Sequence, residues 1–159
     1  MHTPTGRIDD IFEKHADTVY RVALSQTSQQ ADAEDVFQEV FVKLFTTDTI
    51  FQSDEHIKAW LIRVTINKCR DLHKSAWNKK TVELTPELPD AALEPIDMEE
   101  ILARLPLNFR SVIHLFYFED MSITQIAETL QTNENTVKTW LSRGRKLLKV
   151  DLERSLDDV

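Results

Sequence analysis

Hydrophobic side chains recur along most of the chain at spacings of three and four residues, which is the period of one face of an α-helix. The spacing predicts helices over 8–27, 31–45, 57–77, 98–105, 106–117, 122–130 and 132–149. No stretch shows the convincing apolar and polar alternation of a half-buried strand. Only 2 glycines and 5 prolines punctuate the chain. The pattern therefore predicts an all-α fold.

Residues 81–95 interrupt the helical pattern with three of the five prolines and no basic residue. Proline removes a backbone donor and biases the preceding residue away from helix. We therefore expect two small helical domains, residues 7–78 and 96–155, joined by a flexible acidic linker over 79–95. The second is expected to be a four-helix domain that ends in an acidic tail, 151–159.

The segments 122–130 and 132–149 have the plan of a helix-turn-helix, two helices joined by a short turn. Ser122 and Gln125 have the spacing of a capping box, and Asn133 can cap the second helix. Gln131 stands in a turn that usually contains glycine. The sequence therefore predicts a helix-turn-helix in the second domain.

The net charge of −8 is unevenly distributed. Residues 1–57 hold 11 acidic and 4 basic side chains, and residues 81–101 hold 7 acidic and no basic ones. Two islands are basic: 58–80 has 7 bases and 1 acid, and 134–149 has 5 bases and 1 acid. The islands predict polyanion-binding surfaces, whereas the acidic remainder repels phosphate. We hypothesise that the chain needs a partner before it engages DNA.

Each basic island lies on one side of a predicted helix. On helix 57–77 the polar side chains that share an arc of roughly 60° by helical periodicity are Arg63, Asn67, Arg70 and Lys74. On helix 132–149 the arc opposite the apolar stripe carries Lys138, Thr139, Ser142, Arg143, Arg145, Lys146 and Lys149. Such a face can lie in the major groove and hold phosphates. The alternative is a pair of ordinary solvated helix faces.

Catalytic motifs are absent from the sequence. It contains no phosphate-binding glycine loop, no HExxH and no Cys/His set with metal-ligand spacing. We therefore expect no enzyme, no catalytic residue, no metal, no cofactor and no small-molecule substrate. Cys69 is the single cysteine, so no internal disulfide is possible. No apolar run is long enough to cross a membrane, and we expect a cytoplasmic protein.

Three segments resemble the extracytoplasmic-function (ECF) sigma factors, the small two-domain branch of the bacterial sigma-70 family. They are DAEDVFQEVFVKLF (32–45), HIKAWLIRVTINKCRDLHK (56–74) and the stretch from 105 to 148. They follow one another in the family's order and span nearly the whole chain. The resemblance implies an alternative sigma factor, which binds core RNA polymerase, directs it to the −35 and −10 promoter elements and helps to melt the DNA.

The resemblance also assigns side chains to partners. Those implied to contact the β′ clamp helices of polymerase are Asp35, Gln38 and Glu39. Those implied for the −10 element are Arg63, Asn67, Asp71 and Lys74, to which the helix periodicity adds Arg70. Those implied for the −35 element are Thr136, Lys138, Thr139 and Arg143, to which the basic arc adds Ser142 and Lys146. The loop 48–54 would capture a flipped base, and the second domain would also bind the β flap.

Two positions depart from the family pattern, because Trp140 and Gly144 fall where many members carry Arg and Ala. The resemblance further implies a monomer on polymerase and an anti-sigma factor as regulator. Two alternatives remain for the function. One is a sigma-like decoy that binds only an anti-sigma protein, and the other is a helix-turn-helix regulator that binds DNA without polymerase.

Overall fold

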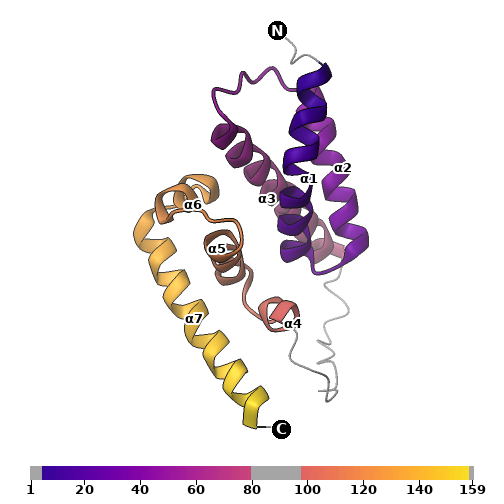
Figure 1. Ribbon diagram of the computed structural model, residues 1–159. Helices are drawn as coiled ribbons and strands as arrows, with labels where there is room; N and C mark the ends of the chain where they lie inside the picture. The colour runs from indigo at the N-terminus through magenta and orange to yellow at the C-terminus, as the bar shows by residue number, and fades with distance from the viewer. Residues whose placement is uncertain (1–4, 80–97, 158–159) are drawn as a thin grey trace.

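A computed structural model describes residues 5–79 and 98–157, which form helices and short loops (Figure 1). The helices are α1 (Thr5–Thr27), α2 (Gln30–Thr46), α3 (Asp54–Lys79), α4 (Met98–Ala103), α5 (Leu107–Tyr117), α6 (Ile123–Leu130) and α7 (Glu134–Asp157). Within these two ranges there is no strand, which confirms the all-α fold. No helix in the described part of the chain is both long and apolar enough to cross a membrane.

The first three helices pack around one apolar core (Figure 1). Val19 from α1, Val40 from α2 and Leu61 from α3 are fully buried in it. Cys69 is also buried there, and burial raises the pKa of its thiol to about 12. A thiol that stays protonated at neutral pH is a poor nucleophile, so Cys69 is a core residue.

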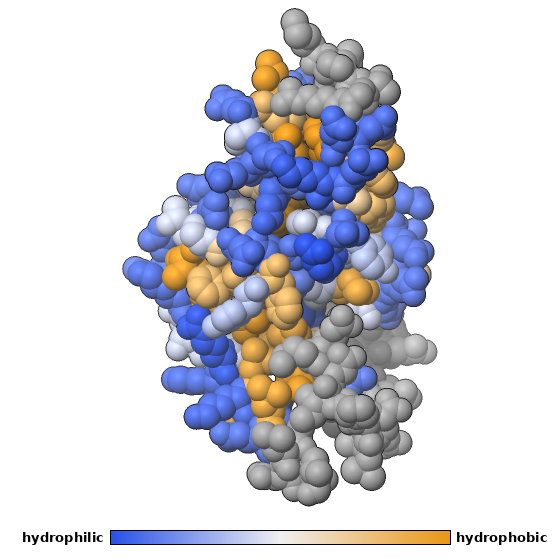
Figure 2. Space-filling model, viewed as in Figure 1, coloured by the Kyte–Doolittle hydropathy of each residue, from blue (hydrophilic) through white to orange (hydrophobic). Residues whose placement is uncertain are grey.

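The remaining four helices form the predicted four-helix unit with its helix-turn-helix. α5 lies between α1 and α7, and α7 runs past it as a long rod toward the C-terminus (Figure 1). The core of this unit contains Val112, Ile126, Val137 and Leu141. Figure 2 shows a mostly hydrophilic surface, with an apolar strip low on the molecule in the region of α4, α5 and the C-terminal half of α7.

Several boundaries differ from those predicted. α3 begins at Asp54 rather than at residue 57, because the Ser53 hydroxyl accepts the backbone N–H of His56 and caps an earlier turn. α7 continues to Asp157, so the predicted acidic tail over 151–159 is wrong as a separate segment. The predicted linker over 79–95 lies almost wholly outside the described residues.

The two units pack against each other, which the sequence did not predict. Val22 of α1 and Ile62 and Ile66 of α3 are at most 1% exposed, and all three belong to the core cluster of the second unit. We call these three side chains the shared face. Helix contacts follow the same seam, with α1 against α5 and α3 against α6. The apolar packing of the second unit therefore continues onto the first.

Polar contacts on Glu119 cross this seam. The Glu119 carboxylate is 1% exposed and accepts from Arg21 of α1, Nε at 3.3 Å and Nη2 at 3.0 Å. The His114 Nε2 lies 2.8 Å from Oε2 of the same carboxylate. Lys58 of α3 donates its Nζ to the Glu119 backbone oxygen at 2.6 Å. These four residues, the Glu119 cluster, join α1, α3 and α5.

A second polar junction lies where α1 ends. The Gln26 side chain is buried and donates to the Ser111 hydroxyl of α5 at 2.8 Å. The Gln26 carbonyl lies 2.7 Å from His73 Nε2 and accepts from Arg110 Nη2 at 3.2 Å. Carbonyls at a helix C-terminus lack partners within the helix. Here donors from both units contact one of them, so the end of α1 is part of the seam.

Candidate nucleic-acid interface

The turn between α6 and α7 has the geometry of a helix-turn-helix. The predicted capping box is confirmed: the Ser122 hydroxyl accepts from Gln125 N at 3.1 Å, and the Gln125 side chain accepts from Ser122 N at 2.9 Å. Gln131 takes the place of the usual glycine with φ 55° and ψ 47°, the left-handed conformation. This conformation lets Thr132 N donate back to the Ala127 carbonyl at 2.9 Å and turns the chain sharply.

The start of α7 is held at two points. Asn133 Oδ1 accepts from the backbone N–H of Thr136 at 2.7 Å, which confirms the predicted cap. The Thr124 hydroxyl of α6 donates to Glu134 Oε1 of α7 at 2.6 Å. Together these bonds set the angle at which α7 leaves the turn.

One face of α7 is core and the other is open. Val137 and Leu141 are buried, as the apolar stripe predicted. The six side chains predicted for the −35 element are exposed or half-buried and lie on the open face: Thr136, Lys138, Thr139, Ser142, Arg143 and Lys146. They extend over three turns of helix, enough to follow a major groove.

Arg145 is an exception to the basic arc. Its Nε donates to the Tyr117 hydroxyl at 2.6 Å, and its guanidinium lies 5.5 Å from the Tyr117 ring centre and 5.7 Å from that of Phe116. A cation over an aromatic face is attracted by the ring quadrupole. Arg145 therefore joins α7 to α5.

Gly144 allows α7 to approach α5. A Cβ at this position would lie 2.5 Å from Ile113 Cδ1 and 3.3 Å from Phe109 Cβ. Both distances are shorter than ordinary van der Waals contact. The glycine that departs from the family pattern is therefore a packing residue. Trp140, the other departure, is half-buried against the same core.

The second candidate surface is on α3. Arg63, Asn67 and Lys74 are exposed and Arg70 is half-buried, so the polar arc predicted from the periodicity is available to a ligand. Asp71 is exposed as well, but it lines a groove between α2 and α3. Asp71 therefore lies next to Arg70 of the arc and also beside the side chains predicted to contact polymerase.

That groove contains the predicted polymerase-contact residues. Its volume is about 860 Å³, and Asp35, Gln38 and Glu39 line its α2 side. Lys68 Nζ of α3 lies 4.0 Å from Glu39 Oε2, a weak exposed ion pair. Two large apolar side chains on the same helix, Val42 at 60% and Phe45 at 53%, are exposed. Acidic and apolar groups are thus presented together on α2.

In the loop between α2 and α3, Phe51 is buried and the adjacent Ile50 is exposed. Phe51 is buried, with its ring centre 5.4 Å from that of Trp60 and 5.4 Å from that of His56. Ile50 is 74% exposed. An anchored loop with an outward apolar side chain can contact an unstacked base.

The Glu119 cluster and the shared face had no signal in the sequence that singled them out. Ile62 and Ile66 are four residues apart on α3, off the main apolar stripe, which is the single local hint of a second buried face. Within the described parts of the chain, no group of three or more His, Cys, Asp or Glu side chains could hold a metal ion.

Comparisons with known proteins match both units. The model of Sigma-70 region 2 matches residues 11–79, and that of Sigma-70, region 4 matches residues 96–148. The RNA polymerase sigma factor SigV of Bacillus subtilis is 30% identical over 145 residues, which cover 88% of this chain and 87% of SigV. The ECF RNA polymerase sigma factor SigL of Mycobacterium tuberculosis is 30% identical, covering 90% of this chain and 87% of SigL.

Solved structures show the same fold. The sigma factor RpoE, in complex with the anti-sigma factor NepR from Bartonella quintana, superposes with a TM-score of 0.75 at 19% identity, covering 91% of this chain and 96% of that one. CnrH, in complex with the cytosolic domain of CnrY, gives a TM-score of 0.65 at 22% identity, covering 95% and 91%. Together with the two matched regions and the curated relatives, they show that the chain belongs to the extracytoplasmic-function branch of the sigma-70 family.

Proposed function

We propose that this chain is the promoter-recognition subunit of a bacterial RNA polymerase, an alternative sigma factor. It supplies promoter specificity, and the polymerase catalyses RNA synthesis. The observation that carries this is the combination of three open surfaces on one chain of this family. They are the polar arc of α3, the basic face of α7 and the acidic groove of α2. The proposed role needs no catalytic side chain.

The first unit has what is needed to hold melted −10 DNA. The cations Arg63, Arg70 and Lys74 on α3 would neutralise phosphates, and Asn67 between them can hydrogen-bond a base. Ile50 in the adjoining loop offers an apolar contact to a base taken out of the stack. Unstacking costs a few kcal/mol per base, so such contacts have to offset about that amount.

The second unit has what is needed to read duplex −35 DNA. α7 follows a short turn and presents polar and basic groups on one side, the arrangement in which a recognition helix enters the major groove. Its first turns carry Thr136, Lys138 and Thr139, and Arg143 follows one turn later. Arginine can bind a guanine edge with two hydrogen bonds, which makes Arg143 the first candidate for a base contact.

The acidic groove of α2 suits a basic, partly apolar protein surface. Asp35 and Glu39 supply charge, and Val42 supplies apolar area in the groove. Phe45, exposed elsewhere on α2, adds apolar area outside the groove. Buried aromatic anchors surrounded by polar groups dominate the energy of protein interfaces. We assign this groove to the β′ clamp helices of polymerase.

An anti-sigma protein is a further expected partner. The solved structure of the sigma factor RpoE is a complex with the anti-sigma factor NepR, and that of CnrH is a complex with the cytosolic domain of CnrY. The similarity supports a regulator of this kind for the present chain as well.

Reversing the charge of the α2 groove tests the proposed function. Asp35→Lys together with Glu39→Lys should abolish co-elution with core RNA polymerase, because the groove would then repel a basic partner. Both side chains are exposed, so thermal unfolding should stay within a few degrees of the parent chain. Asp9→Lys with Glu13→Lys makes the same charge change at the same spacing on exposed α1 positions and should leave co-elution intact.

The two remaining functions predict different results in the same experiment. A polymerase-independent regulator would not co-elute with core polymerase in any form, and the free chain would shift a specific duplex. A decoy would bind neither polymerase nor DNA. Either result would overturn the proposed function.

A further inference from the structure

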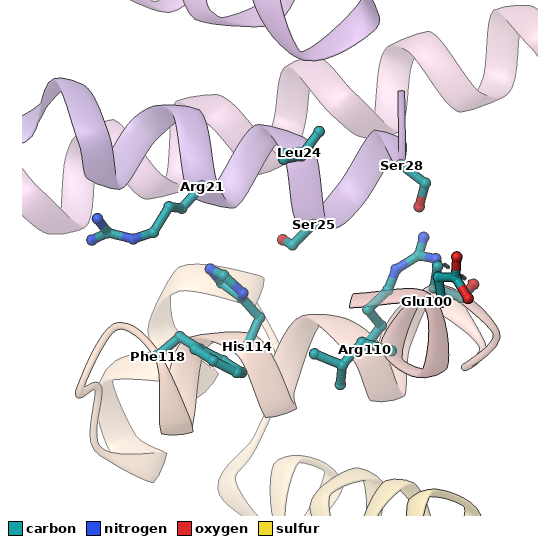
Figure 3. A pocket seen from close by; sticks show the side chains of 10 residues that line it. Arg21, Leu24, Ser25, Ser28, Glu100, Arg110, His114 and Phe118 are labelled. Atoms are coloured by element: carbon teal, nitrogen blue, oxygen red, sulfur yellow. Dashed lines mark hydrogen bonds between the residues drawn. The ribbon is translucent and has the colours of Figure 1, made fainter. Parts of the chain in front are cut away.

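The C-terminal end of α5 carries ring side chains that face two different neighbours. His114 and Phe118 have stacked rings, with 5.3 Å between their centres, and both line a cavity of about 320 Å³ between α1, α4 and α5 (Figure 3). Phe116 and Tyr117 lie instead against α7, with ring centres 5.7 Å and 5.5 Å from the Arg145 guanidinium. Tyr117 is 51% exposed. About half of this side chain therefore reaches solvent beside α7.

Arg145 is held at one nitrogen and open at the other two. Its Nε donates to the Tyr117 hydroxyl at 2.6 Å. Within the described residues, neither Nη atom of Arg145 has a hydrogen bond, and no carboxylate forms an ion pair with it. The side chain is exposed on the surface of α7. Both Nη groups are therefore available to an anion from outside the chain.

The Tyr117 hydroxyl still has a proton to donate. An arginine Nε can only donate, so the phenol oxygen is the acceptor in its bond with Arg145. A phenol can accept and donate at once, and no acceptor for its proton lies in the described part of the chain. The phenol O–H and the guanidinium Nη groups are thus neighbouring free donors, joined by one short hydrogen bond. A phosphate has the acceptor oxygens and the negative charge to bind both.

These donors lie on one flank of the open face of α7. At about 100° per residue, Arg145 is separated by roughly 20° from Lys138 and by roughly 40° from Lys149, and both lysines are exposed. A helix with its side chains is about 10–12 Å wide, and the major groove is about 12 Å wide. Side chains on the flank of a helix in that groove therefore meet the phosphates at its edge. Arg145 has this position, and Tyr117 reaches it from α5.

We propose that Tyr117 and Arg145 form one phosphate-binding site, which holds the DNA backbone beside the −35 element. Arg145 supplies the charge, and Tyr117 fixes the guanidinium and donates its own O–H. The site extends the DNA-contacting surface from the helix-turn-helix to α5. This inference rests on the proposed function, because its ligand is DNA bound along α7. The alternative is a contact that only joins α7 to α5.

Two variants separate the charge from the hydroxyl. Arg145→Gln removes the cation, and Tyr117→Phe removes the hydroxyl but keeps the ring. Arg104→Gln, at another exposed arginine, and Tyr20→Phe, at the other tyrosine of the chain, are the matched controls. The probes are duplexes with the −35 sequence selected from a randomised promoter library, and duplexes of random sequence. Their binding is measured with the full chain, alone and with core polymerase, at a series of salt concentrations.

Arg145→Gln should weaken binding about 10-fold for every sequence, because a charged hydrogen bond is lost. It should also lower the slope of log affinity against log salt by about 1, because one phosphate contact is lost. Tyr117→Phe should weaken binding by about the same factor and leave the slope close to that of the parent, because the charge stays. In the Arg145→Gln background Tyr117→Phe should cost less, because the two side chains bind one phosphate. Both controls should bind as the parent chain does.

Duplexes with a neutral backbone position locate the site. Replacing single phosphates near the −35 element by uncharged methylphosphonates should weaken binding of the parent chain at several positions. At one of them the replacement should have no effect on Arg145→Gln and a smaller effect on Tyr117→Phe than on the parent. A contact that only packs α7 against α5 does not link one side chain to one phosphate in this way.

The inference is wrong if Arg145→Gln keeps the salt slope of the parent, or if Tyr117→Phe costs as much in the Arg145→Gln background as in the parent chain. Promoter-selective binding that neither variant weakens would likewise refute the site and leave the proposed function standing. If core polymerase does not bind the chain, the proposed function fails, and the free chain on random duplexes then tests the pair. If no form of the chain binds DNA, both fail.

Discussion

Gly144 is the residue at which α7 comes closest to α5. Alanine would favour the helix by about 1 kcal/mol over glycine, but its Cβ would meet Ile113 Cδ1 at 2.5 Å and Phe109 Cβ at 3.3 Å. Overpacking of a core costs about 1–3 kcal/mol. We expect Gly144→Ala to lower the free energy of unfolding by about 1 kcal/mol, as measured by urea denaturation. Ile113→Val removes the nearest atom, so Gly144→Ala should be better tolerated in that background. If Gly144→Ala raised the free energy of unfolding equally in the parent chain and in Ile113→Val, the Ile113 side chain would be able to move away from the new Cβ at no cost.

At the scale of elements, α7 combines two kinds of cation on one helix, and they should behave differently. Arg143 is exposed one turn beyond Thr139, and Lys149 is exposed a further turn and a half along. Arg143→Ala should weaken binding to the preferred −35 sequence by about 1–3 kcal/mol and relax the preference at one position. Lys149→Ala should weaken binding equally across sequences, as a phosphate contact does. Transcription from a randomised promoter library measures both. If Arg143→Ala weakened binding equally for all DNA sequences, Arg143 would be a phosphate contact and not a base contact.

The helices and their caps are the part of the structure that the sequence predicted most completely. Helix periodicity and capping residues are local signals, so the helices, the Ser122 box and the Asn133 cap could be predicted and are confirmed. The basic arc of α7 was predicted from the same period. Arg145 was placed on that arc and is exposed, but its contact with Tyr117, 28 residues away, could not be predicted because such a contact leaves no trace in that period. α7 also continues through the acidic residues that were expected to form a tail.

At the scale of the whole molecule, the seam lay beyond prediction, because its contacts join residues far apart in sequence. Arg21 and Glu119 are separated by 98 positions, and Lys58 and Glu119 by 61. Contacts between residues so far apart in the sequence produce no periodic pattern in it. Ile62 and Ile66 could be recognised as apolar, but their burial depends on a second unit whose docking site no local rule describes. Two domains were predicted correctly, and their closed packing was not.

The closed molecule should lose stability in acid through Glu119. Burial opposes its ionisation, but hydrogen bonds from His114 and Arg21 and their charges outweigh burial and lower the pKa of Glu119 below the usual 4.5. Arg21, Lys58 and His114 are the charged or titratable groups that face it. A lowered pKa means that the ionised carboxylate stabilises the fold above pH 4.5, and that this contribution fades as the pH falls through the lowered pKa.

Comparison with Glu119→Gln isolates this contribution from that of the other carboxylates. The parent chain should be more stable than Glu119→Gln by about 2 kcal/mol near neutral pH, and the difference should shrink below pH 4.5. Urea unfolding at a series of pH values measures it. A difference that stays constant down to pH 3 would show that packing, not charge, makes Glu119 important.

The position of the shared face along the chain has a consequence during synthesis. All three of its residues precede residue 67, whereas α5 and α6, which cover it, begin at residue 107 and end at residue 130. At 5–20 residues per second, a ribosome needs roughly 3 to 10 s to make the 51 residues from the end of α3 to the end of α6. Throughout that interval the nascent first unit displays Val22, Ile62 and Ile66 to solvent. Newly made chains are therefore prone to aggregate for a defined period. The yield of folded protein in a cell should depend on the translation speed over the second half of the mRNA.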